Sequence, residues 1–367
     1  GTNCNSTTYD PASAYEPASG STIMSYAGIC GANNLQSVED PVFHSASVED
    51  ISDYITTQTR ANPSSTTPLA NDIPTVNAGV DYTIPAETPF ALTAVGSDAD
   101  ALSYSWEQLD LGTPQSLPLT DLGNGPIFRA FAPINEPTRV FPRLDDLLNG
   151  VNTAAIGEVL PSTSRNLNFR ATVRDGEGGV SSDDMVITVD GTSGPFAVTS
   201  FNTGSILAGG SLETVTWNVA GTNSGAINVS DVAIEMSADG GLTYPYILAS
   251  ATTNDGSQTV TVPNVDIANA RLRVRALGNV FFDVNDANLT VNSDSGQPGI
   301  VFTQSGGDTR PFEASGPGLD DSYEISLNGD PAGLVTIEIA ADSQTLVSSD
   351  GVNFSPSLQL VFDSTAA

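Results

Sequence analysis

The chain has 367 residues, with 43 acidic side chains against 11 basic ones, all of them arginine, and a formal net charge of −32. A charge of this size and sign repels nucleic acid and anionic membrane surfaces, so we expect neither as a partner. There is no run of about 18 apolar residues, which excludes a predicted membrane span.

The length accommodates two to four domains at roughly 100–200 residues each. Abundant glycine and proline (34 and 23 residues) favour β-sandwich modules over long helices. Two interpretations of the acidity stay open: a solvated surface suited to a saline medium, or carboxylates clustered on Ca²⁺, which prefers several oxygen ligands.

One stretch, Ser19–Gly31, has a residue order that indicates a chemistry, with Met24 inside a turn bounded by serine and glycine and followed by Tyr26 and Cys30. It resembles the Met-turn of the metzincin zinc peptidases, and most closely that of bacterial reprolysin-like metallopeptidases, from Tyr15 onward. The resemblance implies that residues 1–62 are the tail of a peptidase domain and that Met24 supports a zinc site from below.

The zinc ligands themselves are absent from the sequence. No H-E-x-x-H motif occurs, and His44 is the only histidine. Because zinc needs three or four converging ligands, we expect no zinc site in this chain and no catalysis by it. The Zn²⁺ ion would belong to an intact parent enzyme, and we interpret His44 as structural.

The two cysteines, Cys4 and Cys30, both lie near the start of the sequence. In an exported protein an even count favours one disulfide, and a pair of free buried thiols is the alternative. Together with the resemblance, this predicts a secreted, extracellular bacterial protein. The sequence Gly1–Asn3 looks like the interior of a longer precursor.

A helix is predicted from Val48 to Thr57, with Val48, Ile51 and Ile55 on one face and a capping box formed by Ser47 and Asp50. Residues 63–74 follow as a linker rich in proline, serine and threonine.

Residues 75–192 are predicted to form an Ig-like or cadherin-like β-sandwich with a long insertion. Alternating segments mark its strands, at 82–85, 90–95, 102–107, 167–173 and 185–189. Trp106 is the expected core aromatic. The insertion, 109–164, either covers a peptidase cleft or caps the sandwich with a short helix near 144–148, and the capping interpretation is favoured.

The segment Gly96–Trp106 resembles the D-x-D-x-D-x-L-x-Y-x-W signature of cadherin-like and polycystic-kidney-disease-like repeats. That resemblance implies a Ca²⁺ site, although Ala101 or Leu102 occupies the third acidic position. The calcium candidates are Asp98, Asp100, Asp175 and Glu177.

Residues 193–293 are predicted to form a second, Ig-like or fibronectin-like sandwich. Its expected strands lie at 196–199, 213–219, 232–237, 258–262, 270–276 and 287–291, with a hairpin turn at Asp239–Gly240. Arg271, Arg273 and Arg275 share one strand face. They form either a patch for an anion or sugar acid or, as favoured, partners for neighbouring carboxylates.

Residues 294–367 resemble the opening strands of a Calx-β-like module, with segments at 320–331, 335–339 and 357–362. Such a partial module leaves a sheet edge with unpaired backbone groups, through which copies of the chain would associate.

The resulting fold class is mainly β: serial Ig-like sandwiches preceded by a Met-turn and helix remnant of a metzincin domain. Two functions follow from it. The first is an accessory, non-catalytic portion of a secreted zinc endopeptidase that acts on protein substrates. The alternative is an extracellular structural or adhesive protein, calcium-stiffened and assembling through its terminal sheet edge.

Overall fold

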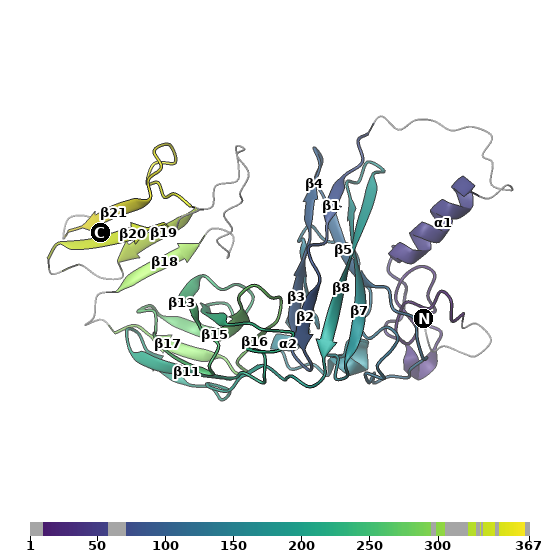
Figure 1. Ribbon diagram of the computed structural model, residues 1–367, viewed down its shortest axis with the longest axis horizontal. Helices are drawn as coiled ribbons and strands as arrows, with labels where there is room; N and C mark the ends of the chain where they lie inside the picture. The colour runs from purple at the N-terminus through teal and green to yellow at the C-terminus, as the bar shows by residue number, and fades with distance from the viewer. Residues whose placement is uncertain are drawn as a thin grey trace.

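The computed structural model describes residues 10–57, 71–294, 299–304, 322–327, 331, 333–341 and 345–363. The chain is mainly β, and two sandwiches in series dominate it (Figure 1). The predicted fold class of serial Ig-like β-sandwiches is therefore confirmed.

The N-terminal segment carries a 3₁₀ turn, η1 (Gly31–Asn33), and one helix, α1 (Ser45–Thr57). The helix begins three residues before its predicted start, because its first N–H groups are satisfied by groups outside the predicted capping box. The Ser45 N–H donates to Glu107 Oε2 at 2.9 Å, and the Ala46 N–H donates to His44 Nδ1 at 3.2 Å.

The apolar side chains of α1 lie differently from the prediction. Ile51 and Ile55 are exposed rather than packed against a domain. The helix is attached to the first sandwich by Glu49, whose carboxylate pairs with Arg170 at 2.7 Å. Its position therefore depends on contacts at its N-terminal half.

The first sandwich comprises eight strands. They are β1 (Thr75–Asn77), β2 (Tyr82–Pro85), β3 (Phe90–Thr93), β4 (Val95–Ser97), β5 (Ser103–Gln108), β6 (Thr138–Phe141), β7 (Arg165–Arg174) and β8 (Val180–Asp190). One sheet has the order β2-β8-β7-β5, and the pairs β1–β4 and β3–β6 form two ribbons. The predicted strand at 90–95 is split between β3 and β4, which pair with different partners.

Four phenylalanines form the centre of this core: Phe90 on β3, Phe128 in the insertion, Phe141 on β6 and Phe169 on β7. Their ring centroids lie 4.8–6.1 Å apart. Trp106 is buried as predicted, and its indole N–H donates to the Pro137 carbonyl at 3.0 Å. The insertion thus supplies part of the core, because Phe128 completes the aromatic cluster.

The insertion folds against the sandwich and contains α2 (Leu144–Leu148) and the 3₁₀ turn η2 (Thr153–Ile156). The predicted short helix is confirmed. Arg139 pairs with the fully buried Glu158 at 2.7 Å, and Arg165 pairs with Asp121 at 2.9 Å. These ion pairs anchor the long connection to the sandwich.

The second sandwich comprises nine strands. They are β9 (Ala197–Val198), β10 (Ile206–Ala208), β11 (Leu212–Asn218), β12 (Asp231–Ser237), β13 (Tyr246–Thr253), β14 (Ser257–Thr261), β15 (Ile267–Ala276), β16 (Phe282–Val284) and β17 (Leu289–Asn292). One sheet has the order β10-β17-β15-β12-β13, with β16 also on β15, and it faces the sheet β14-β11-β9.

The hairpin turn predicted at Asp239 follows β12. The Asp239 carboxylate accepts hydrogen bonds from the N–H groups of Leu242 and Thr243 at about 3 Å and from the Thr243 hydroxyl at 2.6 Å. Burial opposes ionisation of this carboxyl, but these hydrogen bonds outweigh it and lower its pKa.

The C-terminal part that the structure describes forms two ribbons. One pairs β18 (Ile300–Gln304) with β19 (Tyr323–Leu327), and the other pairs β20 (Val335–Ala340) with β21 (Ser357–Phe362). They lie beyond the second sandwich (Figure 1). The register of β20–β21 places Ile337 opposite Leu360, on a face that is only half-buried.

Candidate functional site

The two sandwiches meet at a joint that includes backbone pairing. The Ala91 N–H donates to the Val280 carbonyl and the Phe282 N–H to the Pro89 carbonyl, each at 3.0 Å. The Phe281 ring is buried against Phe196, with centroids 5.1 Å apart. The segment before β16 thus extends the β3 ribbon of the neighbouring sandwich.

A second contact of the joint comes from the insertion. Leu147 and Leu148 of α2 pack with Tyr244, Phe282 and Val284 of the second sandwich. The Arg271 guanidinium donates to the Leu148 carbonyl at 3.2 Å. The buried apolar residues of both sandwiches form one continuous cluster, so the joint is part of the core and not a surface contact.

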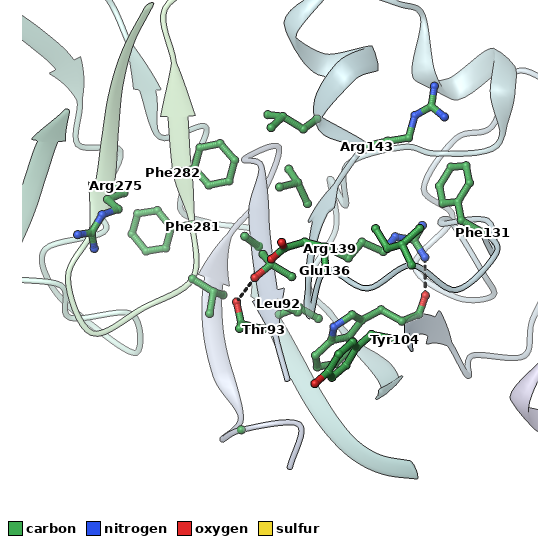
Figure 2. A pocket seen from close by; sticks show the side chains of 18 of the residues that line it. Leu92, Thr93, Tyr104, Phe131, Glu136, Arg139, Arg143, Arg275, Phe281 and Phe282 are labelled. Carbon is green, nitrogen blue, oxygen red and sulfur yellow. Dashed lines mark hydrogen bonds between the residues drawn. The ribbon is translucent and has the colours of Figure 1, made fainter. Parts of the chain in front are cut away.

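A cleft of about 1270 Å³ opens beside this joint and extends around the β3–β6 ribbon. Figure 2 shows Arg275, Phe281 and Phe282 on one side of the ribbon and Tyr104, Phe131, Arg139 and Arg143 on the other. Binding sites occur preferentially at such domain interfaces.

The register of the ribbon assigns its two faces. Ala91 lies opposite Val140, and both pack against the Tyr244 cluster of the second sandwich. Leu92 lies opposite Arg139, so these two residues are on the other face, toward the first sandwich. The ribbon is therefore a wall between the two lobes of the cleft.

Three guanidinium groups surround one aromatic ring in the lobe formed by the insertion. The central carbons of Arg129, Arg139 and Arg143 lie 5.0, 4.8 and 5.5 Å from the centroid of the Phe131 ring. We call this group the arginine cage. Cation–π attraction stabilises a guanidinium at these separations.

Carboxylates neutralise the cage incompletely. Arg139 pairs with Glu158, and Arg143 pairs with Asp146 at 2.9 Å. Arg129 has no carboxylate oxygen within 4.0 Å among the described residues, and its guanidinium donates to the Gln36 side-chain carbonyl. Burial lowers the pKa of both Arg129 and Arg139. Burial therefore disfavours the charged form of both groups more than their partners favour it.

The other lobe contains two arginines that share one glutamate, beside a tyrosine ring. Arg273 and Arg275 both bind Glu235, at 2.6 and 2.8 Å, and the Arg273 guanidinium carbon lies 3.9 Å from the centroid of Tyr244. This confirms the favoured interpretation of these two arginines, which neutralise a neighbouring carboxylate. Arg271 differs, because its guanidinium donates to the Leu148 carbonyl at the joint. Burial raises the pKa of Tyr244, so its phenol stays protonated.

The walls of the cleft combine charged, aromatic and apolar side chains. In the described ranges, no group of three or more His, Cys, Asp or Glu side chains is placed to hold a metal ion. The lining includes guanidinium groups, the carboxylates of Asp40, Glu136 and Glu235, aromatic rings, and apolar side chains such as Ile134 and Ile247. Arginine and aromatic side chains are enriched at protein interfaces.

Met24 lies in the turn that the sequence resemblance singled out, and its role beneath a zinc site stays a prediction. Its side chain is 65% exposed. The turn before it is held by Glu16, whose carboxylate accepts the Ser21 N–H at 2.7 Å and the Thr22 hydroxyl at 2.6 Å. The adjoining cavity is about 30 Å³, room for one water molecule. The geometry around Met24 thus gives no support to a metal-supporting role.

His44 also lies at this small cavity, where its ring stacks on Tyr15 with centroids 5.8 Å apart. The ring is buried, and Nδ1 accepts the Ala46 N–H at the start of α1. These contacts describe a structural residue.

Cys30 is disulfide-bonded and buried. Cys4, its predicted partner, lies outside the described residues, so the Cys4–Cys30 pairing stays a prediction.

The calcium candidates lie at one end of the first sandwich. Asp98 and Asp100 precede β5, while Asp175 and Glu177 follow β7, and Ser103 of β5 pairs with Arg174 of β7. The Asp175 carboxylate already accepts N–H groups from the side chain of Asn71 and the backbones of Glu177 and Gly179.

These contacts determine the ionisation of Asp175. Burial opposes its ionisation, but the hydrogen bonds outweigh that effect and lower its pKa. A carboxylate whose oxygens accept several N–H groups is stabilised without a cation.

Comparison with known proteins gives a limited result. No family model matches the chain, and no curated protein matches it. The resemblance to reprolysin-like peptidases therefore stays a prediction from sequence. Among the helices of the described residues, none combines the length and apolarity that crossing a bilayer requires.

Solved structures that resemble the chain are tandem Ig and fibronectin modules. The Ig1-2 module of the Drosophila receptor protein tyrosine phosphatase DLAR is 10% identical, and the match covers 60% of this chain and 100% of that one at a TM-score of 0.33. Sidekick-1 immunoglobulin domains 1-5 are 12% identical, with 80% and 53% covered and a TM-score of 0.20. The chicken CNTN1 FN1-FN3 domains are 11% identical, with 61% and 68% covered and a TM-score of 0.22. These scores carry no argument about function.

Proposed function

We propose that this chain is an extracellular structural or adhesive protein, in which two β-sandwiches act as one stiff unit that presents the cleft. The observation that carries the proposal is the joint. Backbone hydrogen bonds from Ala91 and Phe282 and the buried Phe281 ring connect the two sandwiches through a shared core.

Stiffness follows from the kind of contact at the joint. Modules joined only by a flexible linker move independently by default, unless their interface is large and apolar. Here the connection between β8 and β9 is itself fixed: the Ala86 N–H donates to the Ser193 carbonyl at 2.8 Å, and the Phe196 N–H donates to the Thr88 hydroxyl at 2.9 Å. A ligand that contacts both walls of the cleft would therefore meet a preformed surface.

An extracellular location agrees with two features. Cys30 is disulfide-bonded, and structural disulfides persist in oxidising compartments. The net charge of −32 keeps the chain soluble and separate from other acidic molecules.

The accessory portion of a zinc endopeptidase is the other candidate. It is supported by the resemblance at Ser19–Gly31 alone, since the exposed Met24 does not pack beneath a metal pocket. Calcium stiffening at Asp98, Asp100, Asp175 and Glu177 is a further hypothesis. If the ion binds there, a chelator lowers the melting temperature of the chain, and an unchanged temperature excludes it.

Pulling the chain in a force microscope tests the structural role. We expect residues 75–292 to unfold in one event, releasing about 75 nm of chain at roughly 3.6 Å per residue, because the two sandwiches share a core. Two separate events of about half that length would show independent modules and contradict the proposal.

A further inference from the structure

We propose that the cleft binds a polypeptide segment of a partner protein that combines apolar side chains with carboxylates, and that the arginine cage receives a carboxylate. This inference rests on the proposed function and deepens it, because it names the kind of partner that would bind in the cleft of the stiff unit.

The first argument is the distribution of charge. Five of the eleven arginines line the cleft in a chain that carries 43 acidic side chains: Arg129, Arg139, Arg143, Arg273 and Arg275. Three carboxylates, those of Glu158, Asp146 and Glu235, pair with four of these guanidiniums. Asp40 and Glu136 also lie on the lining, and among the described residues neither reaches a guanidinium within 4.0 Å. Arg129 is therefore the arginine of the cleft whose guanidinium has no ion pair in the described part of the chain.

The second argument is an unsatisfied donor. Arg129 is more than nine-tenths buried and lines the cleft, and its Nε–H has no hydrogen-bond partner among the described residues. The Nε–H of Arg139 is unsatisfied in the same way. A buried donor without a partner costs free energy, and because both Nε atoms are closed to solvent, a ligand oxygen recovers that cost only when the guanidinium turns toward the cleft. A carboxylate suits this site because its two oxygens match the fork of a guanidinium.

The third argument concerns access to the cage. Arg143 is half-exposed at 51% of its side-chain surface, and the Phe131 ring is partly open, so an incoming carboxylate meets the cage from the solvent side. In the other lobe, Arg275 is 40% exposed. A ligand extended across the cleft would therefore meet an exposed guanidinium group in each lobe.

The apolar rim decides between ligand classes. Ile134, Leu242 and Ile247 are exposed on the lining, and such side chains favour apolar groups on the partner. Because Arg129 is the cleft arginine without an ion pair among the described residues, the matching ligand carries few carboxylates. A polyanion such as a uronate polysaccharide carries many charges and would be repelled by the acidic surface around the cleft.

A fluorescence anisotropy titration tests the proposal. The probe is a short labelled peptide with two glutamates among leucine, valine and serine, and the control peptide has glutamine in place of both glutamates. Work at about 0.15 M salt limits the long-range repulsion to a Debye length of about 8 Å. We expect the glutamate peptide to bind at least about tenfold more tightly than the glutamine peptide.

Two substitutions locate the site. Arg143→Gln removes the half-exposed cage arginine together with its ion pair to Asp146, and Arg129→Met removes the buried one. Each is expected to weaken binding of the glutamate peptide about fivefold to tenfold. Arg170→Gln is the matched control: it removes the same charge at β7, where Arg170 pairs with Glu49 and Asp184 away from the cleft. It should change affinity less than about twofold.

Equal binding of the two peptides, or equal weakening by Arg143→Gln and Arg170→Gln, would overturn the inference. If polygalacturonate binds more tightly than the peptide, the choice of a polypeptide ligand is overturned. If the chain self-associates and Arg143→Gln abolishes the self-association, the choice of a partner protein is overturned as well. If the peptide fails to bind while the sandwiches still unfold in one event under force, the inference fails and the proposed function stands.

Discussion

The two sandwiches and the C-terminal ribbons have the same alternating pattern of apolar residues but different packing. In β7, Leu167, Phe169 and Ala171 alternate with polar residues and are fully buried. In β20, Val335, Ile337 and Ile339 alternate equally well, yet each is only half-buried. Alternation therefore predicts a strand with two unlike faces, while burial depends on a second layer opposite the apolar face.

The joint shows how such a layer arises between modules. Phe281 precedes the short strand β16 and pairs with Phe90 of the neighbouring sandwich. The core thereby continues from one sandwich into the next. The described C-terminal residues contribute none of their side chains to this core, so we expect the two regions to respond differently to substitution.

The largest effect is expected from Phe281→Ala. The ring is 1% exposed and packs against Phe196, so its removal leaves a cavity at the joint. We expect the free energy of unfolding of the two sandwiches to fall by about 3–5 kcal/mol, measured by urea denaturation. A loss below about 1 kcal/mol would mean that the joint does not share the core.

A smaller effect of opposite sign is expected from Asp283→Asn. Burial raises the pKa of Asp283 to about 7, although its carboxylate accepts the Val198 N–H at 2.6 Å. Because the folded state holds this proton more tightly than the unfolded state, stability falls as the pH rises from about 4 to 7.

The Asp283→Asn variant, which does not titrate, should therefore be more stable than the parent at pH 8, by about 2 kcal/mol, and about equal to it at pH 4. Thermal unfolding at both pH values measures the difference. Equal stability at pH 8 would show that Asp283 ionises without cost in the folded chain.

The smallest effect is expected in the ribbons, from Val361→Ser. Val361 is exposed on β21 and contributes to no core cluster among the described residues. We expect the stability of the two sandwiches to change by less than about 0.5 kcal/mol. A change as large as that of Phe281→Ala would show that the ribbons are packed as tightly as the joint.

Local sequence signals predicted much of this fold. The strand β2 has its predicted bounds, and β5, β7, β11 and β12 lie within a few residues of theirs. β8 begins earlier than predicted, because the polar residues at 181–184 alternate in exposure but give no apolar pattern in the sequence. The strands β1, β6, β10, β13, β16 and β18 were not predicted, since their pairing depends on distant partners.

The candidate site was less predictable, because its residues converge from several segments. Arg271, Arg273 and Arg275 were noted on one strand face, but nothing in the sequence indicates that Arg143 and Arg275 line one cleft. The Glu107 side chain that caps α1 was equally unpredictable, since Glu107 lies 62 residues after Ser45, whose N–H it accepts. Met24 matched a motif, yet its exposure depends on packing that a motif does not encode.

The unity of the two sandwiches is tested most directly by their two tryptophans, Trp106 in the first and Trp217 in the second, both buried. Trp217→Phe leaves the fluorescence of Trp106 to report the first sandwich, and Trp106→Phe leaves Trp217 to report the second. In each variant, the remaining fluorescence and far-UV circular dichroism are followed through the same urea titration. A shared core predicts that the two signals have coincident midpoints in both variants. A fluorescence midpoint that differs from the circular dichroism midpoint, with a second transition visible in the latter, would show that each sandwich unfolds alone and would contradict the account.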